Sequence, residues 1–257
     1  MDGDYHYYGG AKENDIDREK FLLQYYGINI IRFENKVVFE QPQSIVNKII
    51  EIKELKFVKD FRLIVITQPS FITDEGMFIN SLFENGVDRV HIRKPGASVE
   101  EHRELIEAID SRWHGKLSLH DCHCLASEYG CGVHLNGRNP NVPLFKVPKL
   151  SASCHSIEEV AERKLKCDYV FMSPIFDSIS KQGYHSAFSH MDIENAAKSG
   201  VIDDSVIALG GISWERIPLV EAMGFGGAAL LGDVWKDVTL FCRNLRQTHL
   251  GRTTARP

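Results

Sequence analysis

The sequence lacks three features that would each place it in a special class of protein. None of its apolar runs reaches the ~20 residues that a membrane-spanning helix needs. Its six cysteines in 257 residues are too sparse for the disulfide framework of a small secreted domain. Its first residues do not show the basic, apolar and small-residue segments of a secretory signal. We therefore expect a cytoplasmic protein with reduced thiols.

An excess of positive charge is also missing. The 30 lysines and arginines are outnumbered by 35 aspartates and glutamates, which gives a formal net charge of −5. This balance offers no general attraction for nucleic acid or an anionic membrane, so we expect neither as a partner, and any anion site must be local. The proportions of hydrophobic residues (43%) and charged residues (25%) are those of a soluble protein with a buried core.

From Leu63 onwards, short apolar runs alternate with segments of helix length. Runs that are apolar throughout are typical of parallel strands covered on both faces. Eight can be counted: LIVIT, RVHIR, LSLH, GVHL, LSASC, YVFMS, VIALGG and GAALLG. Helical periodicity lies between several of them, at 75–85, 99–110, 157–165 and 214–223. Eight strand–helix units within 61–235 predict an α/β fold of the (β/α)8 TIM-barrel type, and an open doubly wound sheet is the alternative.

The two ends of the chain follow other patterns. Residues 1–58 read as helix, strand, strand and helix, a small α+β fragment that is too short to bury a core alone. Residues 236–257 read as the end of a helix and a tail. The tail is basic from Arg243, and we expect it to fray into solvent.

In a barrel of this kind the active site lies at the carboxyl ends of the strands, and polar residues stand at those positions here. Arg93 could bind a phosphate through its planar guanidinium, or pair with an acid at the barrel mouth. Lys181, in a Ser/Gly-rich loop, could fold over an anion or stay solvated. His155 could exchange protons near neutral pH or serve a structural role.

Glycine-rich segments follow the seventh and eighth predicted strands. In this position backbone N–H groups can approach an anion, and a following helix adds its dipole. We expect phosphate binding there, with ligand-free tight turns as the alternative. The residues concerned are Gly210, Gly211, Leu231 and Gly232.

The segment HDCHC, from His120 to Cys124, suggests a metal site, and His134 follows at a short distance in sequence. Imidazole and thiolate groups suit zinc. However, a Cys-x-Cys pair across a strand–helix junction does not easily direct both sulfurs to one centre. A role without metal is therefore the favoured interpretation of HDCHC.

Across residues 61–235, six ordered segments resemble the thiamin phosphate synthase/TenI family: VHIRKPG, LSLHDCHCLASEYGCGVHLN, SASCHSIEEV, CDYVFMSPIFDSISKQG, ALGGI and GFGGAALLG. The resemblance implies an enzyme of thiamin biosynthesis that acts on a small molecule, thiazole phosphate. The synthases of this family join it to hydroxymethylpyrimidine diphosphate and use Mg²⁺. The tautomerases aromatise the thiazole by moving a proton and need no cofactor.

The resemblance also assigns roles to residues. It implies proton transfer by His155, with Ser153 and Lys181 lining the site. It implies substrate or phosphate binding by Arg93, Lys94, Ser178, Ser180, Gly210, Gly211, Leu231 and Gly232. Asp121 would bind Mg²⁺ only in a synthase.

Three positions depart from the synthase pattern. Pro95 takes the place of a lysine, His120 that of an asparagine and Asn139 that of the second magnesium aspartate. Asparagine is a poorer magnesium ligand than aspartate. We therefore expect a tautomerase, with a synthase or a non-catalytic phosphate-binding barrel as alternatives. A homo-oligomer is compatible with each of these.

Residues 1–55 resemble the carboxyl-terminal half of a very-short-patch-repair-like endonuclease domain, through DGDYH, DIDREKFLLQYYGINIIRF and VNKIIEI. Such nucleases hold magnesium with several acidic groups. Asp2 and His6 remain here, but the upstream acids are missing. We expect a remnant without nuclease activity, and a partner-binding extension is the alternative.

Overall fold

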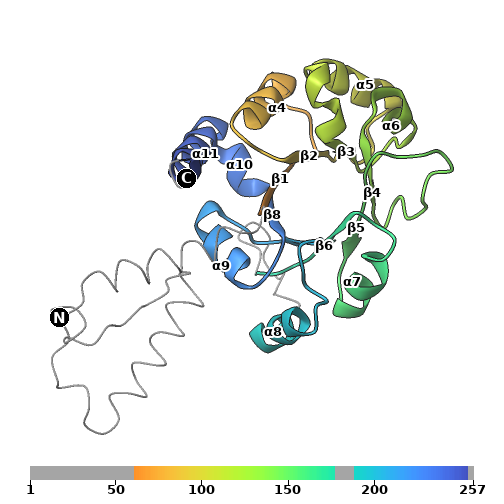
Figure 1. Ribbon diagram of the computed structural model, residues 1–257. Coiled ribbons are helices and arrows are strands. Elements are labelled where there is room, and N and C mark those ends of the chain that lie inside the picture. Colours follow the sequence, from red (N-terminus) through yellow and green to blue (C-terminus); the bar gives the residue numbers. More distant parts are fainter. Residues whose placement is uncertain (1–60, 177–187, 254–257) are drawn as a thin grey trace, which may run out of the picture.

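The computed structural model describes residues 61–176 and 188–253, with side chains as far as 246. Its eight parallel strands form a closed barrel in the order β1 to β8 (Figure 1). The strands are β1 Arg62–Ile66, β2 Arg89–Ile92, β3 Leu117–Leu119, β4 Gly132–Leu135, β5 Leu150–Cys154, β6 Tyr169–Met172, β7 Val206–Leu209 and β8 Gly227–Leu230. Arg62 of β1 lies beside Gly227 of β8, which closes the ring. The predicted (β/α)8 barrel is confirmed, and the open sheet is excluded.

Helices surround the strands as an outer ring (Figure 1). They are α4 Glu75–Glu84, α5 Val99–Glu107, α6 Cys124–Tyr129, α7 Ile157–Arg163, α8 His190–Lys198, α9 Ile217–Ala222, α10 Gly232–Lys236 and α11 Val238–Thr253. Two 3-10 segments, η2 Ser111–Lys116 and η3 Trp214–Arg216, complete the set among the described residues. The helix predicted at 214–223 is thus divided into η3 and α9. Ser98 begins α5 with a capping box in which its side chain and that of Glu101 satisfy backbone N–H groups.

The strand residues divide between two layers according to the direction of their side chains. Those that point outwards join the helices in the main core, as Val65 and Val133 do. Those that point inwards in β1, β6, β7 and β8 form a second, smaller apolar cluster, which includes Ile64, Phe171 and Ile207. The barrel interior at β2 to β5 is different, because its buried inward residues are polar: His91, Ser118, His120, His134 and Ser151.

The carboxyl-terminal segment is more ordered than we expected. The expectation that the chain frays from Arg243 is wrong, because α11 continues to Thr253. α11 packs against α4. Cys242 and Leu245 are buried, and the Cys242 sulfur lies 3.7 Å from the Ser81 hydroxyl of α4. This contact secures α11 to the barrel wall.

The predictions made for residues 1–58 lie outside the described residues. None of the described helices has the length and apolar character required to cross a membrane.

Candidate active site

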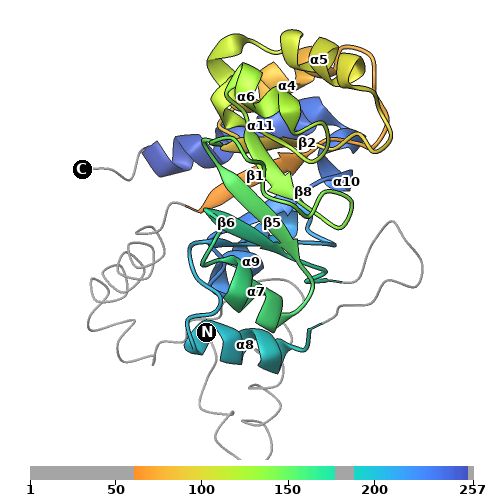
Figure 2. The same cartoon turned by 90° about the vertical axis from the view of Figure 1, so that its right-hand side faces the viewer.

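The carboxyl ends of the eight parallel strands lie at one end of the barrel (Figure 2). The structure brings most of the predicted site residues to this end, because each lies at the end of a strand or shortly after it. They are Arg93 after β2, Asp121 after β3, Ser153 and His155 at the end of β5, Gly210 and Gly211 after β7, and Leu231 and Gly232 after β8. Ser178, Ser180 and Lys181 lie outside the described residues.

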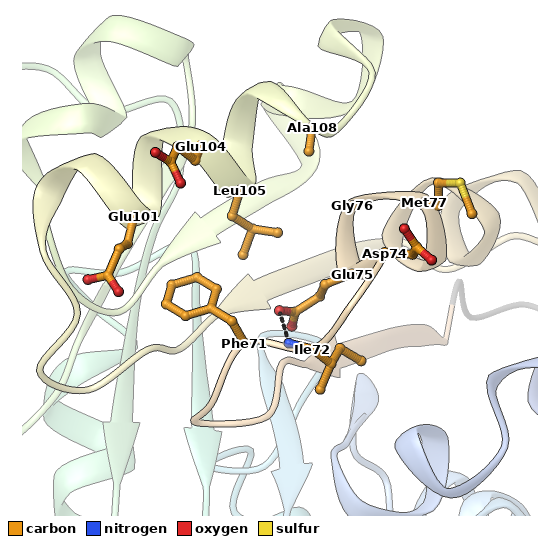
Figure 3. A pocket seen from close by; sticks show the side chains of 10 residues that line it. All are labelled: Phe71, Ile72, Asp74, Glu75, Gly76, Met77, Glu101, Glu104, Leu105 and Ala108. Carbon is orange, nitrogen blue, oxygen red and sulfur yellow. Dashed lines mark hydrogen bonds between the residues drawn. The ribbon is translucent and has the colours of Figure 1, made fainter.

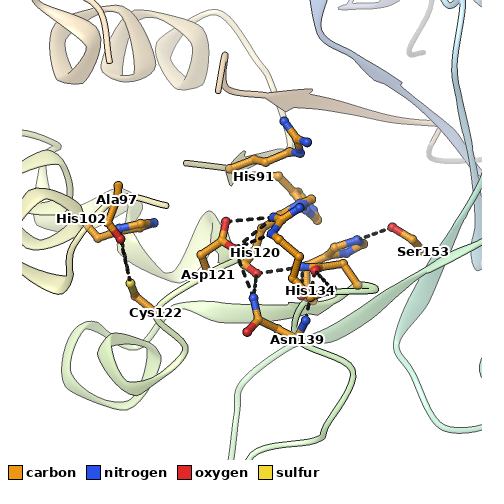
Figure 4. A network of polar contacts seen from close by, with 12 residues as sticks. His91, Ala97, His102, His120, Asp121, Cys122, His134, Asn139 and Ser153 are labelled. Carbon is orange, nitrogen blue, oxygen red and sulfur yellow. Dashed lines mark hydrogen bonds and ion pairs between the residues drawn. The ribbon is translucent and has the colours of Figure 1, made fainter. Parts of the chain in front are cut away.

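Asp121 is bound by basic and amide groups rather than left open to a cation (Figure 4). Arg138 donates to it from Nη2, 3.0 Å from Oδ1 and 3.2 Å from Oδ2. The side-chain amide of Asn139 donates to Oδ1 at 3.1 Å. Arg93 is close enough that its pKa, lowered mainly by burial, is lowered further by Arg138 and raised by Asp121. Two guanidinium groups and one carboxylate leave this part of the site with net positive charge.

These residues do not fit a magnesium site. Mg²⁺ in proteins is usually held by one or two carboxylates, substrate phosphates and water. Here the one carboxylate, Asp121, already accepts an ion pair and an amide hydrogen bond. Asn139, at the second position, uses its amide to donate hydrogen bonds to Asp121 and to the His120 carbonyl.

His155 is exposed at the end of β5, and its backbone N–H donates to Glu159 at 2.8 Å. Its Nδ1 lies 3.1 Å from the carbonyl oxygen of Ser173. Because a carbonyl oxygen can only accept, this contact places the ring hydrogen on Nδ1. Nε2 is then the basic nitrogen and can accept a proton from a ligand.

The segment 173–176, which follows β6, connects His155 with the glycine-rich end of β7. The Ser173 N–H donates to the Cys154 carbonyl at 3.1 Å, and the Phe176 N–H donates to the Gly210 carbonyl at 3.1 Å. Gly210 has φ +94°, and a Cβ there would lie 2.8 Å from the Pro174 Cα. Only glycine therefore allows this close passage of two loops.

Polar contacts also order the two glycine-rich turns. Arg216 donates to the Gly211 carbonyl at 2.7 Å, and its guanidinium stands 4.8 Å from the centre of the Phe176 ring. The Trp214 N–H donates to the carboxylate of Asp233 at 2.9 Å. Asp233 lies in the first turn of α10, so this bond connects the segments after β7 and β8. Gly232 has open space where a Cβ would stand, which leaves room for a ligand beside it.

Lys94 differs from its predicted role in phosphate binding. Its side chain is buried, and its amino group lies 2.7 Å from each carboxylate oxygen of Glu75. The same amino group donates to the carbonyls of Gln68 at 3.0 Å and Ser70 at 2.7 Å. Protein acceptors therefore engage this ammonium group, and it joins the loop after β1 to α4 instead of facing a substrate.

A groove between α4 and α5 lies beside this ion pair and apart from the strand ends just described (Figure 3). Its lining includes the acidic side chains of Asp74, Glu75, Glu101 and Glu104, which do not suit a phosphate. The groove contains none of the predicted site residues, so we do not place the active site there.

Three buried histidines meet beneath the mouth of the barrel (Figure 4). They come from neighbouring strands: His91 from β2, His120 from the end of β3 and His134 from β4. His134 is 2.9 Å from the hydroxyl of Ser153, which connects the group to the predicted site. Cys122 belongs elsewhere, since its sulfur lies 3.4 Å from His102 of α5.

The sequence did not predict this group of histidines. The spacing of HDCHC and His134 drew attention to two of them, but with cysteines as the other ligands. His91 lies within the apolar run RVHIR and gave no separate signal. A strict inward–outward alternation along β2 to β4 is the pattern that would have identified all three.

Comparison with known proteins agrees with this geometry. The model of the family described as "Thiamine monophosphate synthase" matches residues 63–234. The thiamine-phosphate synthase of Photorhabdus laumondii is 29% identical over 175 residues, which cover 64% of this chain and 81% of the relative. The solved structure of thiamine phosphate pyrophosphorylase from Bacteroides thetaiotaomicron is 36% identical, with a TM-score of 0.64. It covers 72% of this chain and 94% of its own.

A second solved structure, thiamine phosphate pyrophosphorylase from Pyrococcus furiosus, is similar in fold. It has a TM-score of 0.57 at 21% identity and covers 76% of this chain and 98% of its own. The family match extends from β1 into α10 and so includes every strand of the barrel. The chain belongs to the thiamine monophosphate synthase family.

Proposed function

We propose that this enzyme acts on thiazole phosphate in thiamin biosynthesis, and that it moves a proton on the thiazole as a tautomerase does. The observation that carries this proposal is the state of Asp121, whose carboxylate is held by Arg138 and Asn139. A diphosphate leaving group needs charge neutralisation by a metal, and here the Asp121 carboxylate already pairs with Arg138. Proton transfer needs only a bound substrate and a placed acid or base.

His155 supplies the base in this proposal. Its Nδ1 contact with the Ser173 carbonyl fixes the ring and leaves Nε2 to accept the proton from the substrate carbon. The same nitrogen can return a proton as the ring becomes aromatic. Ser153, half-buried on β5, precedes His155 by two residues and is assigned to the lining of the site.

The phosphate is assigned to the turns after β7 and β8. Gly210 and Gly211 both have positive φ, so the backbone there is free of side chains that would keep an anion away. We further propose that Lys181 lines the site and that Ser178 and Ser180 bind the phosphate. Arg93 supplies a permanent positive charge on the β2 side of the site.

A synthase is the second candidate, and the names of the relatives favour it over the tautomerase. Both the Photorhabdus relative and the Bacteroides structure carry names of that activity. In that case Mg²⁺ would be required, and Asp121 would have to leave Arg138 to bind it.

One assay distinguishes the two candidates. The purified protein is given thiazole carboxylate phosphate alone in one tube, and with hydroxymethylpyrimidine diphosphate and Mg²⁺ in another. We expect aromatised thiazole in the first tube and no thiamin phosphate in the second. Thiamin phosphate in the second tube would establish the synthase instead.

A variant pair tests the role of His155. We expect His155→Gln to bind thiazole phosphate but to lose isomerisation by a factor on the order of 10²–10⁴. His190→Gln, which alters an exposed histidine on α8, is the matched control and should retain full activity. Equal activity in the two variants would remove His155 from the mechanism.

A further inference from the structure

The barrel interior holds a cluster of three histidine side chains that the proposed reaction does not use. His91 and His134 are fully buried, and His120 is 5% exposed. In the register of β3 with β4, Leu119 pairs with Val133, so the next residues, His120 and His134, also lie side by side. One nitrogen from each of the three rings lies within 4.8 Å of the others. Among the residues that the structure describes, this is the one such group of histidine, cysteine and acidic side chains.

We propose that His91, His120 and His134 bind one divalent transition-metal ion, such as Zn²⁺ or Co²⁺, inside the barrel. This inference goes beyond the proposed function and does not depend on it. Three imidazoles with an open fourth position are a donor set of catalytic zinc sites. Nitrogen donors favour zinc, cobalt, nickel or copper over magnesium, which takes oxygen ligands.

Two of the rings have outer partners that would hold them as metal ligands. His91 Nε2 lies 2.7 Å from the Tyr169 hydroxyl, which leaves Nδ1 on the side of His120. His134 Nδ1 lies 2.8 Å from the Ser151 hydroxyl, which leaves Nε2 on the side of Ser153. A second hydrogen bond of this kind fixes the tautomer and orientation of a ligating histidine. Metal-binding proteins rely on such partners almost as much as on the ligands themselves.

The protonation state of the group also suits a metal. Burial lowers the pKa of His91 and His120 well below the ordinary value, and it lowers that of His134 to about 3. The rings are therefore neutral, as metal binding requires. Phe171 closes the group from below, with its ring centre 4.7 Å from that of His91 and 4.8 Å from that of His134. Arg93 and Arg138 lie near enough to affect His120 and would favour an anionic fourth ligand.

Metal binding requires the three rings to move from their present positions. His91 Nδ1 and His120 Nε2 are 2.9 Å apart and share a hydrogen, and the His120 and His134 rings are stacked with centres 4.1 Å apart. With Zn–N bonds of about 2.0–2.1 Å, the three nitrogens of a tetrahedral site lie about 3.3 Å from one another. Metal binding would therefore replace the His91–His120 hydrogen bond, and the rings would have to turn until their nitrogens reach that spacing. The hydrogen between His91 and His120 moves to an outer nitrogen, so no proton is lost.

The test uses the full chain, treated with a chelator and then titrated with Co²⁺. We expect one Co²⁺ per chain, with visible absorption bands typical of nitrogen ligands and a rise in melting temperature. Zn²⁺ should displace the cobalt with the same stoichiometry. An intense near-ultraviolet band from thiolate coordination would instead place the ion on cysteines and overturn the proposal. Failure to bind one equivalent would also overturn it.

Variants locate the site. We expect His91→Gln and His134→Gln each to weaken Co²⁺ binding at least tenfold. Tyr169→Phe removes the outer partner of His91, together with the contact of that hydroxyl with Ser118, and should weaken binding by about 10–100-fold. The double variant Cys122→Ser/Cys124→Ser and the exposed His190→Gln should bind as the parent protein does.

Circular dichroism and thermal unfolding of each variant identify those that keep the fold. If a histidine variant does not fold, the Tyr169→Phe result decides whether the histidines bind the ion. That change keeps the aromatic ring at position 169 and all three histidines. Binding equal to that of the parent in a folded His91→Gln or His134→Gln protein would place the ion elsewhere and show that the histidines form only a hydrogen-bonded network. If neither histidine variant folds, binding by Tyr169→Phe that equals the parent would count against the proposal, because loss of an outer partner should weaken a histidine-bound ion. Thiazole isomerisation is measured separately, so failure of this proposal and failure of the proposed function give different results.

Discussion

The amino group of Lys94 lies 2.7 Å from both carboxylate oxygens of Glu75, and the two side chains are 0% and 2% exposed. Burying two charges in this way is costly, and the pair persists because each partner neutralises the other. Two carbonyl oxygens accept further hydrogen bonds from the ammonium group. The pair thereby joins the end of β2 to the loop after β1 and the first turn of α4.

Removing one partner should destabilise the protein strongly. We expect Lys94→Met to lower the free energy of unfolding by about 3–5 kcal/mol, because Glu75 is left buried and uncompensated. Denaturation by urea measures the change. Lys149→Met is the matched control, since its pair with Asp168 is exposed and should contribute less than about 1 kcal/mol. A double variant, Lys94→Met/Glu75→Leu, should recover most of the loss. A small effect of Lys94→Met alone would contradict the structural role of the pair.

Gly210 should not tolerate a side chain. Its φ of +94° disfavours any L-residue, and a Cβ would meet the Pro174 Cα at 2.8 Å and its Cβ at 2.9 Å. We expect Gly210→Ala to cost about 1–3 kcal/mol or more, with a lower melting temperature and weaker substrate binding. Gly115→Ala, where the added methyl meets nothing within 4 Å, should leave both quantities almost unchanged. Equal melting temperatures for the two variants would refute the close passage of the loops.

Asp121→Asn separates the two candidate reactions. A tautomerase does not need this carboxylate for a metal, so thiazole aromatisation should continue at a similar rate. A synthase would lose thiamin phosphate formation. The partly exposed ion pair with Arg138 should contribute no more than about 1 kcal/mol to stability, so the variant should remain folded at assay temperature. The measurement is product formation by both variant and parent, with and without Mg²⁺.

The metal-free protein should lose stability in mild acid. Burial lowers the pKa of His91, His120 and His134 in the folded state, whereas histidines of the unfolded chain titrate near about 6.5. Below that pH the unfolded chain binds more protons than the folded one. The free energy of unfolding therefore falls as the pH is lowered, by about 1.4 kcal/mol per pH unit for each histidine.

Urea denaturation between pH 7 and pH 5 measures this slope before most carboxylates titrate. His134→Gln removes one of these groups, so its slope should be shallower than that of the parent. The exposed His190→Gln should keep the slope of the parent. Parallel slopes for the parent and His134→Gln would contradict the neutral, buried state assigned to His134.

Much of the fold was accessible from the sequence because strand and helix residues repeat with different periods. All eight predicted strands are present, and α4 and α7 begin where their periodicity begins. The ends of the helices were harder to predict from the sequence. Pro218 stands in the first turn of α9, and the preceding residues take a 3-10 conformation that periodicity alone does not reveal.

The site was predicted in outline, because residues that follow parallel strands gather at one end of the barrel. The ion pairs in and near the site were not predicted. Lys94 and Glu75 are 19 residues apart, and only the folded barrel brings the end of β2 to the first turn of α4. The same limit applies to Asp121 and Arg138. The grouping of His91 with His120 and His134 was missed for another reason, because apolar residues on the outward faces of β2 to β4 made these strands resemble uniformly apolar runs.

The pairing of β1 with β8 has a consequence for synthesis on the ribosome. Arg62 is among the first barrel residues to emerge and Gly227 among the last, so β1 waits for its second neighbour until nearly the whole barrel has been translated. A nascent chain that ends after β7 has two unpaired sheet edges, which are open to association with other chains. Only the arrival of β8, which pairs with both β7 and β1, covers these two edges.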